Sequence, residues 1–514
     1  MSENLKVLVV IADQLRADCL TGALAAHVDL PNIRAFQDEA TTFTNHFSVT
    51  NPCGPSRASI FTGLYAMNHR SIRNGTPMSD GLPNLPREAR KSGYEPRLYG
   101  YSDTSLDPRI RPPKDPALRT EEQVMPGFTE ALEMRLMESY PWRAYLKAQG
   151  YDLPDYAHFY DSISPDPARP ARPNDPPFYR AEHSDTAFLT DTLLQDLAVR
   201  TDQTWFAVAT YIRPHPPLVA PAPYNTMYDP AALPLPARLD SPEDEAAVHP
   251  FMRAALDGRW MHYLTLGCDP DLDQSSDEYV QLARAIYLGL ATEVDAHFGR
   301  IIRFLKDSGQ YDDTLILFMA DHGEMLGDHR MWGKEIPYDP AYRVPLIIRD
   351  PRNPGQHGQQ VEALTESVDI TPTILDLIGG EVPAGMDGKT LRPFLEGGGP
   401  DHWRDAVHLE LDFSEPDAPT NLQTGTGTAT RDANLAVIRE DRFKLVHFNG
   451  DLPPLLFDMI DDPDELTNLA ENPAHAATLL RLTRKLLSLR MRHADRSLTG
   501  YKMTRAGAMK YDEN

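Results

Sequence analysis

The sequence predicts an α/β fold: a mostly parallel sheet sandwiched by helices, followed by a smaller C-terminal antiparallel sheet plus helix. Three apolar runs, at 6–12, 204–211 and 314–320, are nearly continuous, as expected of strands buried on both faces. Helical patterns separate these runs, and strands that alternate with helices indicate a parallel sheet covered on both sides. At 514 residues the chain is long enough for two domains.

Several further elements can be placed in order along the chain. A short strand is predicted at 96–100. The longest helical pattern covers 279–308, where apolar residues recur at the three- and four-residue spacing of one helix face. Another helix is predicted near 367–377, and the glycine pair at 379–380 is a common helix end.

The C-terminal part has a different pattern. The segment 435–448 predicts a hairpin that turns near 440–441, 455–458 predicts another strand, and a helix is expected from about 474 to 492. The polar tail that follows has few apolar residues, so we expect either an oligomerisation arm that wraps a neighbouring subunit or a disordered end.

We expect a boundary at the glycine-rich segment 397–400. It divides the chain into a large α/β domain, 1–395, and a small C-terminal α+β subdomain, 400–514. Within the first domain, about 105–185 is rich in proline and charge. This segment predicts an irregular insert outside the core, either a lid or a subunit contact.

Composition limits the possible partners. The net charge of -25 argues against nucleic acid, because a phosphate backbone requires a basic face. Three cysteines do not make a disulfide framework in a chain of this length. The N-terminus enters an apolar strand without a signal peptide pattern, and no apolar run reaches the ~18 residues of a membrane span. We therefore expect a cytoplasmic protein that does not bind membranes.

Polar residues follow each of the three buried strands. Asp13 and Gln14 follow the first, His215 the second, and Asp321 and His322 the third. Since ligands bind beyond the carboxyl ends of parallel strands, these side chains are expected to converge. Asp13, Asp321 and His322, with Gln14 as a neutral fourth ligand, would suit a divalent cation. An isolated Asp after a strand is also a common helix cap.

Residues 53–63 carry the second chemical signal. Cys53 precedes Pro55, Ser56 and Arg57 in a loop that runs into an apolar helix, and Pro55 suits the first helical position. The free N–H groups of that turn would favour an anion beside Cys53 or depress its thiol pKa. The alternative is a buried structural cysteine.

The pattern Cys-x-Pro-Ser-Arg, followed by a short helix and Thr-Gly, resembles the signature of the formylglycine-dependent sulfatases of the alkaline phosphatase superfamily. The segment from Asp321 to Lys334 is similar to a metal motif of that superfamily. In this family a maturation enzyme oxidises the cysteine to an aldehyde, and the hydrated aldehyde attacks sulfur or phosphorus. The resemblance implies that Cys53 is the precursor of formylglycine and that a formylglycine-generating enzyme is a partner.

Five positions depart from most sulfatases and narrow the resemblance: Gly54, Gln14, His322, Tyr101 and Asp103. An amide at Gln14 in place of a carboxylate raises the charge of the metal site, and an imidazole at His322 shifts the expected metal from calcium towards manganese. Tyr101 and Asp103 replace a Lys-x-His pair, which indicates a substrate with one negative charge. With these features the chain looks like the branch that hydrolyses phosphonate monoesters and phosphodiesters.

The resemblance implies a role for each matching residue. Cys53, as formylglycine, is the nucleophile, and Arg57 orients its hydrate. Lys334 and His215 contact the transferring group or protonate the leaving oxygen. The expected metal ligands are Asp13, Gln14, Asp321 and His322, and the expected substrate-binding residues are Asn74 and Tyr101, with Asp103 where relatives often have Thr. The alternatives are structural: Lys334 and Arg57 as surface cations, and Asn74 as a turn residue.

The sequence thus predicts a metal-dependent hydrolase of phosphonate monoesters and phosphodiesters, with promiscuous sulfate-ester hydrolysis on small anionic substrates. We expect one divalent ion, with Mn²⁺ favoured and Ca²⁺ possible, and a homo-oligomer, as a tetramer. The close alternative is an arylsulfatase. A two-metal phosphatase would need more ligands, and Asp295 and His297 lie two residues apart on a predicted helix, on different faces. A non-catalytic anion-binding protein would lack the nucleophile or the ligands, and none is missing.

Overall fold

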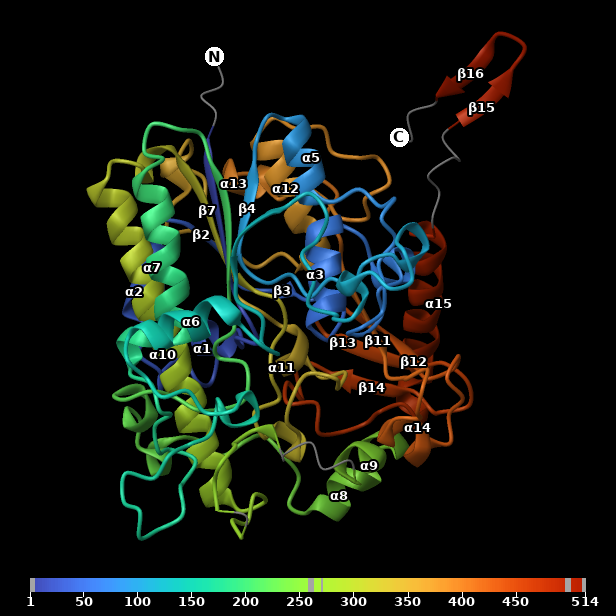
Figure 1. Cartoon of the computed structure of the whole chain (residues 1–514). Helices are drawn as coiled ribbons and strands as arrows, with labels where there is room; N and C mark the ends of the chain where they lie inside the picture. The colour runs from blue at the N-terminus through green and yellow to red at the C-terminus, as the bar shows by residue number, and fades with distance from the viewer. Residues whose placement is uncertain (1–4, 258–262, 270, 495–500, 511–514) are drawn as a thin grey trace.

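The computed structural model describes residues 5–257, 263–269, 271–494 and 501–510. An eight-stranded sheet with the order β5-β4-β6-β1-β7-β8-β2-β9 forms its centre (Figure 1). The strands are β1 Lys6–Ala12, β2 Thr41–Phe43, β4 Pro96–Gly100, β5 Thr129–Glu133, β6 Phe206–Tyr211, β7 Thr314–Ala320, β8 Leu346–Arg349 and β9 Gln360–Val361.

The sheet is mostly parallel, as predicted. β1 pairs in parallel with β6 and β7, and β4 pairs in parallel with β5 and β6. Of the eight strands described, β8 alone runs against its neighbours β7 and β2. Every residue of β1 and β7 is buried, which explains why these strands are continuous apolar runs.

Helices cover both faces of the sheet. Residues Leu8 and Val10 of β1 belong to a core shared with α2, α7 and α10, whereas Val7 and Val9 belong to a core shared with α3, α5 and α12. Figure 1 shows these two groups of helices on opposite sides of the sheet. The helices are α1 Asp18–Thr21, α2 Pro31–Asp38, α3 Cys53–Thr62, α4 Ala66–His69, α5 Leu85–Lys91, α6 Tyr140–Ala148, α7 Asp185–Ala198, α8 Pro242–Ala247, α9 Pro250–Asp257, α10 Asp277–Asp307, α11 Asp339–Tyr342, α12 Ile370–Leu377, α13 Arg392–Leu395, α14 Asn421–Thr426 and α15 Ala476–Arg492.

The predicted C-terminal antiparallel sheet is present. Its order is β11-β12-β13-β14, and Leu482 and Leu486 of α15 pack against it beside Ile438 and Leu445. Two smaller pairs complete the strands. The bounds are β3 His46–Phe47, β10 Thr365–Glu366, β11 Val407–Asp412, β12 Asn434–Arg439, β13 Phe443–Phe448, β14 Leu455–Asp458, β15 Tyr501–Thr504 and β16 Gly507–Lys510.

One prediction about the fold was wrong. The insert at about 105–185 is not wholly outside the core, because its strand β5 joins the edge of the main sheet in parallel with β4. Trp142 of α6 and Phe159 are fully buried in the larger core. The prolines indicated a segment outside the core. The aromatic side chains between them have large apolar surfaces, and the free energy gained by burying these surfaces holds the segment against the core.

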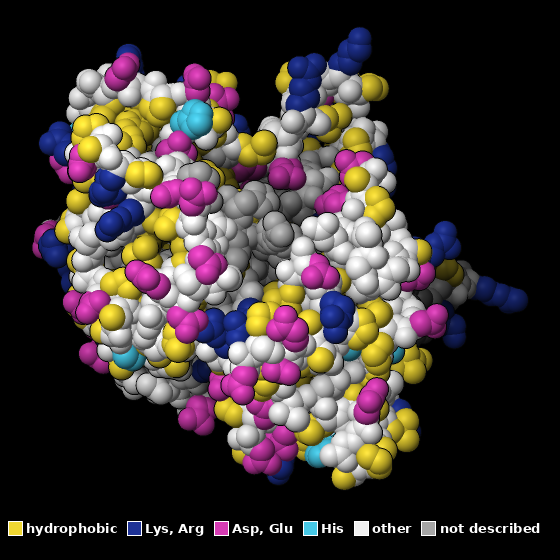
Figure 2. All heavy atoms as spheres, turned by 90° about the horizontal axis from the view of Figure 1, so that it is seen from below, with side chains coloured by type: hydrophobic (Ala, Val, Ile, Leu, Met, Phe, Trp, Pro, Cys, Tyr) yellow, Lys and Arg dark blue, Asp and Glu magenta, His cyan; other side chains and the backbone are white. Residues whose placement is uncertain are grey.

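Charge is spread over the surface. On the face shown in Figure 2, acidic side chains are scattered and interspersed with Lys and Arg. Among the described residues, none of the helices is both long enough and apolar enough to cross a membrane.

Candidate active site

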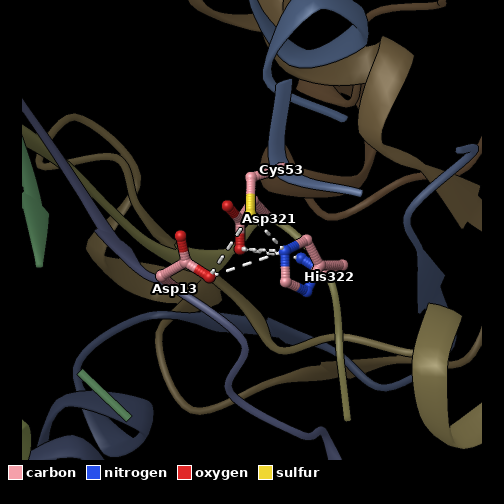
Figure 3. A group of neighbouring side chains, drawn as sticks. All are labelled: Asp13, Cys53, Asp321 and His322. Atoms are coloured by element: carbon pink, nitrogen blue, oxygen red, sulfur yellow. Dashed lines mark hydrogen bonds and ion pairs between the residues drawn. The ribbon is translucent and has the colours of Figure 1, made fainter. Parts of the chain in front are cut away.

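Asp13 and Asp321 lie side by side because the strands that carry them are neighbours in register. Ala12 at the end of β1 pairs with Ala320 at the end of β7, and each Asp follows directly. Cys53 begins α3, and His322 follows Asp321. One ligand atom from each of Asp13, Cys53, Asp321 and His322 lies within 4.8 Å of the others, and all four residues are buried (Figure 3).

Arg57 binds both carboxylates from inside the protein. Its Nε donates to Asp321 Oδ2 at 2.8 Å, and its Nη2 donates to Asp13 Oδ2 at 3.0 Å. Its Nη1 donates to the carbonyl of Tyr101 at 2.7 Å, and the guanidinium lies 4.0 Å from the centre of the Tyr101 ring. The side chain is fully buried, so Arg57 is not the surface cation of the structural alternative.

The two carboxylates influence each other's protonation. Burial and the charge of Asp321 raise the pKa of Asp13. Burial also acts on Asp321, but His322, which is protonated in the acidic range where Asp321 titrates, and the guanidinium of Arg57 outweigh it and lower the pKa of Asp321. Two buried carboxylates that share one guanidinium leave negative charge that a bound cation would offset, so the oxygen-rich donor set fits a divalent metal.

His322 turns one ring nitrogen towards the carboxylates. Its Nδ1 lies 3.0 Å from the carbonyl of Gly323, which can only accept, so Nδ1 carries the proton. The unprotonated Nε2 lies 3.5 Å from Asp13 Oδ1 and 3.2 Å from Cys53 Sγ. Burial lowers the pKa of His322 to about 4, which keeps the imidazole neutral and able to bind a metal.

The protein's own groups do not ionise the thiol of Cys53. Burial and the charge of Asp13 raise its pKa well above the usual value. This differs from the expectation that a helix N-terminus would depress it, because desolvation and a carboxylate 3.9 Å from Sγ outweigh the helix dipole. Cys53 therefore lacks the thiolate that an unmodified cysteine nucleophile requires.

The helix after Cys53 begins earlier than predicted. α3 starts at Cys53 itself, so Pro55 is its third residue and not its first. Proline fits there because the first four N–H groups of a helix have no intrahelical partner. One of them is already used, since the N–H of Gly54 donates to Asn74 Oδ1 at 2.9 Å.

Glycine at position 54 has a steric reason. A Cβ atom there would lie 2.9 Å from Asn74 Oδ1 and 3.0 Å from the carbonyl of Asp103. Any side chain would push these two predicted substrate-binding residues away from Cys53. The departure from the usual sulfatase pattern at Gly54 thus accompanies a close approach of Asn74 and Asp103.

Lys334 and His215 form one hydrogen-bonded pair. Lys334 Nζ donates to His215 Nε2 at 2.8 Å, and His215 Nδ1 donates to the carbonyl of Pro216 at 2.5 Å. Burial and the charge of Lys334 lower the pKa of His215 well below its usual value. Burial opposes the charge of Lys334, but nearby Cys53 and Asp13 raise its pKa above the usual value. The proton of this pair resides on Lys334.

Gln14 is held at both ends of its amide. Its Oε1 accepts from Lys334 Nζ at 2.7 Å, and its Nε2 donates to Glu324 Oε2. Sequence reasoning assigned no role to Glu324, although it lies in the segment between Asp321 and Lys334. The available signal was its position, an acidic residue that follows the predicted ligand pair by two residues.

Tyr101 and Asp103 lie beside the cluster. The Tyr101 hydroxyl donates a hydrogen bond to Asp13 Oδ2, so donating to a substrate oxygen would require this hydrogen bond to break. Asp103 is partly buried and has a φ of 45°, in the left-handed region. Burial, opposed by Arg57 and reinforced by Asp13, raises the pKa of Asp103 to about 8. A protonated Asp103 would not repel an anion.

Asp295 and His297 form no second metal centre. Asp295 Oδ1 accepts from the backbone N–H of Ile33 at 2.7 Å, at the start of α2. His297 Nδ1 instead lies 3.2 Å from Arg300. Over the described part of the chain, Asp13, Cys53, Asp321 and His322 form the one group of metal-binding side chain types close enough to hold an ion.

Two family models match the chain. The model described as sulfatase matches residues 6–380, and the model described as N-sulphoglucosamine sulphohydrolase, C-terminal, matches residues 327–492. The chain is 39% identical to the multifunctional alkaline phosphatase superfamily protein PehA of Trinickia caryophylli, over 98% of each chain. It is 28% identical to the choline-sulfatase of Rhizobium meliloti, over 91% of this chain and 82% of that protein.

Solved structures give a stronger likeness. The phosphonate monoester hydrolase SpPMH from Silicibacter pomeroyi is 55% identical, with a TM-score of 0.95, over 99% of this chain and 100% of that one. The phosphonate monoester hydrolase of Agrobacterium radiobacter is 42% identical, with a TM-score of 0.93 and the same coverage.

Proposed function

Because the chain belongs to the sulfatase family of the alkaline phosphatase superfamily, we propose that it hydrolyses phosphonate monoesters and phosphodiesters and, as a secondary activity, sulfate esters. Similarity over nearly the full length to two phosphonate monoester hydrolases supports this assignment. The observation that carries it is the buried cluster of Asp13, Cys53, Asp321 and His322 at the ends of β1 and β7.

Cys53 is the precursor of the nucleophile. Its thiol is buried, has a raised pKa and lies beside two carboxylates, which makes thiolate chemistry unfavourable. Conversion to formylglycine by a maturation enzyme would supply a hydrated aldehyde, of which one hydroxyl attacks phosphorus or sulfur. The surrounding residues act on this position: Asp13 and His322 face it, and Arg57 holds the two carboxylates in place.

Asp13, Gln14, Asp321 and His322 would hold one divalent cation. When bound, it would polarise the ester and lower the pKa of the attacking hydroxyl. Two carboxylate ligands with an amide and an imidazole favour Mn²⁺, and Ca²⁺ is the second choice.

Lys334 protonates or stabilises the leaving oxygen. It carries the proton of the Lys334–His215 pair, and the neutral His215 accepts one of its hydrogen bonds and so fixes the direction of the ammonium. The Oδ1 of Asn74 is occupied by the N–H of Gly54, which leaves the NH₂ end of the amide as the donor for a substrate oxygen.

The substrate carries one negative charge. Two cations belong to the site: Arg57, which two carboxylates already neutralise, and Lys334. Asp103 stands nearby, and only its protonated form tolerates an additional anion. This charge balance suits phosphonate monoesters and phosphodiesters better than phosphate dianions.

The hairpin of β15 and β16 is the proposed oligomerisation arm of a cytoplasmic homotetramer. In Figure 1 the hairpin lies apart from the body of the protein. Met503 on it is 74% exposed, and Leu487 and Met491 on α15 are also exposed. Apolar side chains of this kind are commonly covered by another subunit.

Turnover of an aryl phenylphosphonate and of the matching aryl sulfate by the purified enzyme tests the proposal. We expect a higher kcat/KM on the phosphonate, and a large preference for the sulfate would instead make the protein an arylsulfatase. Mass spectrometry of the peptide that contains Cys53 tests the nucleophile separately. Fully active enzyme with an unmodified thiol would refute the mechanism.

A further inference from the structure

Gln14 lies next to the cluster of Asp13, Cys53, Asp321 and His322, and its amide could be placed in either of two orientations. An amide has an oxygen at one end, which can bind a cation, and an NH₂ group at the other, which cannot. Rotation by half a turn exchanges the two ends at almost no change in shape. Something other than packing must therefore decide which way the amide of Gln14 is turned.

Two charged groups make this decision, and they agree. Lys334 is an ammonium that can only donate, and it contacts Oε1 of Gln14 at 2.7 Å. On the opposite end, Nε2 of Gln14 donates to the carboxylate oxygen Oε2 of Glu324. Exchanging the ends would set NH₂ against ammonium and oxygen against carboxylate, so both contacts would become repulsive.

Glu324 is itself held as an acceptor. It is 2% exposed, and its Oε1 accepts the backbone N–H groups of Leu326 at 3.0 Å and Gly333 at 2.5 Å. These contacts fix the carboxylate plane and leave Oε2 for Gln14. Backbone donors from the loop that leads to Lys334 thus fix the group that orients Gln14.

The backbone of Gln14 is constrained as well. Its φ is 68°, a conformation that non-glycine residues seldom adopt. Its N–H donates to Asp321 Oδ1 at 3.2 Å, and its carbonyl accepts from the Tyr287 hydroxyl at 2.7 Å. The remaining freedom of Gln14 is the choice between the two ends of its amide, and Lys334 and Glu324 control that choice together.

We infer that Glu324 is a positioning residue that turns the amide oxygen of Gln14 towards the metal site. The inference rests on the metal site proposed above. It explains how a neutral amide can replace a carboxylate ligand. A carboxylate presents an oxygen at either end, whereas an amide needs a partner that orients it, and Glu324 is that partner.

Replacing Glu324 by glutamine keeps the size but removes an acceptor. Glutamine has a single acceptor oxygen, and it cannot serve two backbone N–H groups on one side and the NH₂ of Gln14 on the other. In E324Q only the contact with Lys334 still favours the native orientation of the Gln14 amide, so the amide can turn more readily. We expect Mn²⁺ affinity to fall about 10- to 100-fold, the usual effect of losing a partner that orients a ligand.

The measurement is calorimetric titration of Mn²⁺ into the full-length protein after treatment with a chelator. Glu293→Gln is the matched control. Glu293 lies on α10, is fully buried, and accepts a hydrogen bond from the Ser184 hydroxyl at 2.5 Å. We expect wild-type affinity in this control. Equal affinities in E324Q and wild type would overturn the inference.

A charge exchange separates orientation from general structural damage. In Q14E/E324Q, the carboxylate at position 14 accepts hydrogen bonds from both Lys334 and the amide at position 324. Because its two ends are equivalent oxygens, an oxygen faces the metal site in either orientation. The inference requires E324Q to weaken Mn²⁺ binding in the wild-type background and to strengthen it in the Q14E background. The same sign in both backgrounds would overturn it.

The outcomes remain distinguishable if a variant does not fold. Should E324Q alone be unfolded by circular dichroism, the comparison of Q14E with Q14E/E324Q decides, and equal or weaker binding by the double variant overturns the inference. Failure of the wild-type protein to bind Mn²⁺ or Ca²⁺ would contradict the proposed metal site itself, and with it the role of Glu324.

Discussion

Lys334 and His215 share one hydrogen bond, 2.8 Å between Nζ and Nε2, in which lysine is the donor and the neutral imidazole is the acceptor. Their ordinary pKa values already place the proton on lysine, and the site widens the gap by raising the pKa of Lys334 and lowering that of His215. Lysine, not histidine, holds the proton beside Cys53.

This order predicts which residue assists the leaving group. We expect Lys334→Ala to lower kcat/KM about 10²- to 10⁴-fold on esters with poor leaving groups, and less on activated aryl esters, because proton donation matters most when the leaving oxygen is basic. A series of substituted aryl phosphonates measures this dependence. A larger and steeper loss for His215→Ala than for Lys334→Ala would identify histidine as the donor.

Gly54→Ala should act through Asn74. The added methyl group would lie 2.9 Å from Asn74 Oδ1, so the amide must move and its hydrogen bond with Gly54 is lost. We expect kcat/KM to fall about tenfold or more, as for one hydrogen bond to a charged group. The double variant with Asn74→Ala should be no worse than either single variant.

The fraction of converted Cys53, from mass spectrometry, must be matched between these variants. Wild-type kinetics for Gly54→Ala at equal conversion would contradict the steric argument, and additive losses in the double variant would separate Gly54 from Asn74.

Arg57→Ala should strongly destabilise the protein. It removes the one guanidinium between the carboxylates of Asp13 and Asp321, all of them buried. Breaking a buried ion pair from one side costs about 3–5 kcal/mol. Urea denaturation measures the loss, and added Mn²⁺ should recover part of it by replacing the missing positive charge.

Arg442→Ala is the control for this variant. Its side chain is 52% exposed and pairs with Asp458 and Asp461, so its loss should have little effect. Equal denaturation midpoints for the two variants would show that the ion pairs of Arg57 with Asp13 and Asp321 do not stabilise the fold.

Glu293 should make stability depend on pH. Burial, then the charge of Asp185, raises its pKa from 4.5 to about 8. The folded protein therefore holds a proton that the unfolded chain releases above pH ~4.5. The unfolding free energy from this group falls by ~1.4 kcal/mol per pH unit up to about pH 8 and is constant above it.

Glu293→Gln cannot lose that proton, so its stability relative to wild type should rise between pH 5 and pH 8, as measured by urea denaturation. Glu182→Gln makes the same substitution at a side chain that is 58% exposed and serves as the control. A constant difference between Glu293→Gln and wild type across this range would contradict the raised pKa.

Local patterns predicted much of this protein. The buried strands β1 and β7, the long helix α10 and the C-terminal hairpin of β12 and β13 follow from local sequence patterns, and each lies within two residues of its expected bounds. The convergence of Asp13 and Asp321 followed from the rule that parallel strands end at one edge. At the insert, the prolines led to a prediction of irregular structure outside the core, but Trp142 and Phe159 are buried in the core.

By itself, the sequence determined the fold class, the motif around Cys53 and the residues of the buried cluster of Asp13, Cys53, Asp321 and His322, because these depend on residue type and local spacing. Only the tertiary structure decided how protons and hydrogen bonds are distributed in the cluster: the un-ionised Cys53, the proton on Lys334, the Tyr101 hydroxyl bound to Asp13, and the amide of Gln14 turned by Glu324. The physical reason is that desolvation and donor–acceptor pairing arise between residues distant in the chain, 310 positions apart for Gln14 and Glu324.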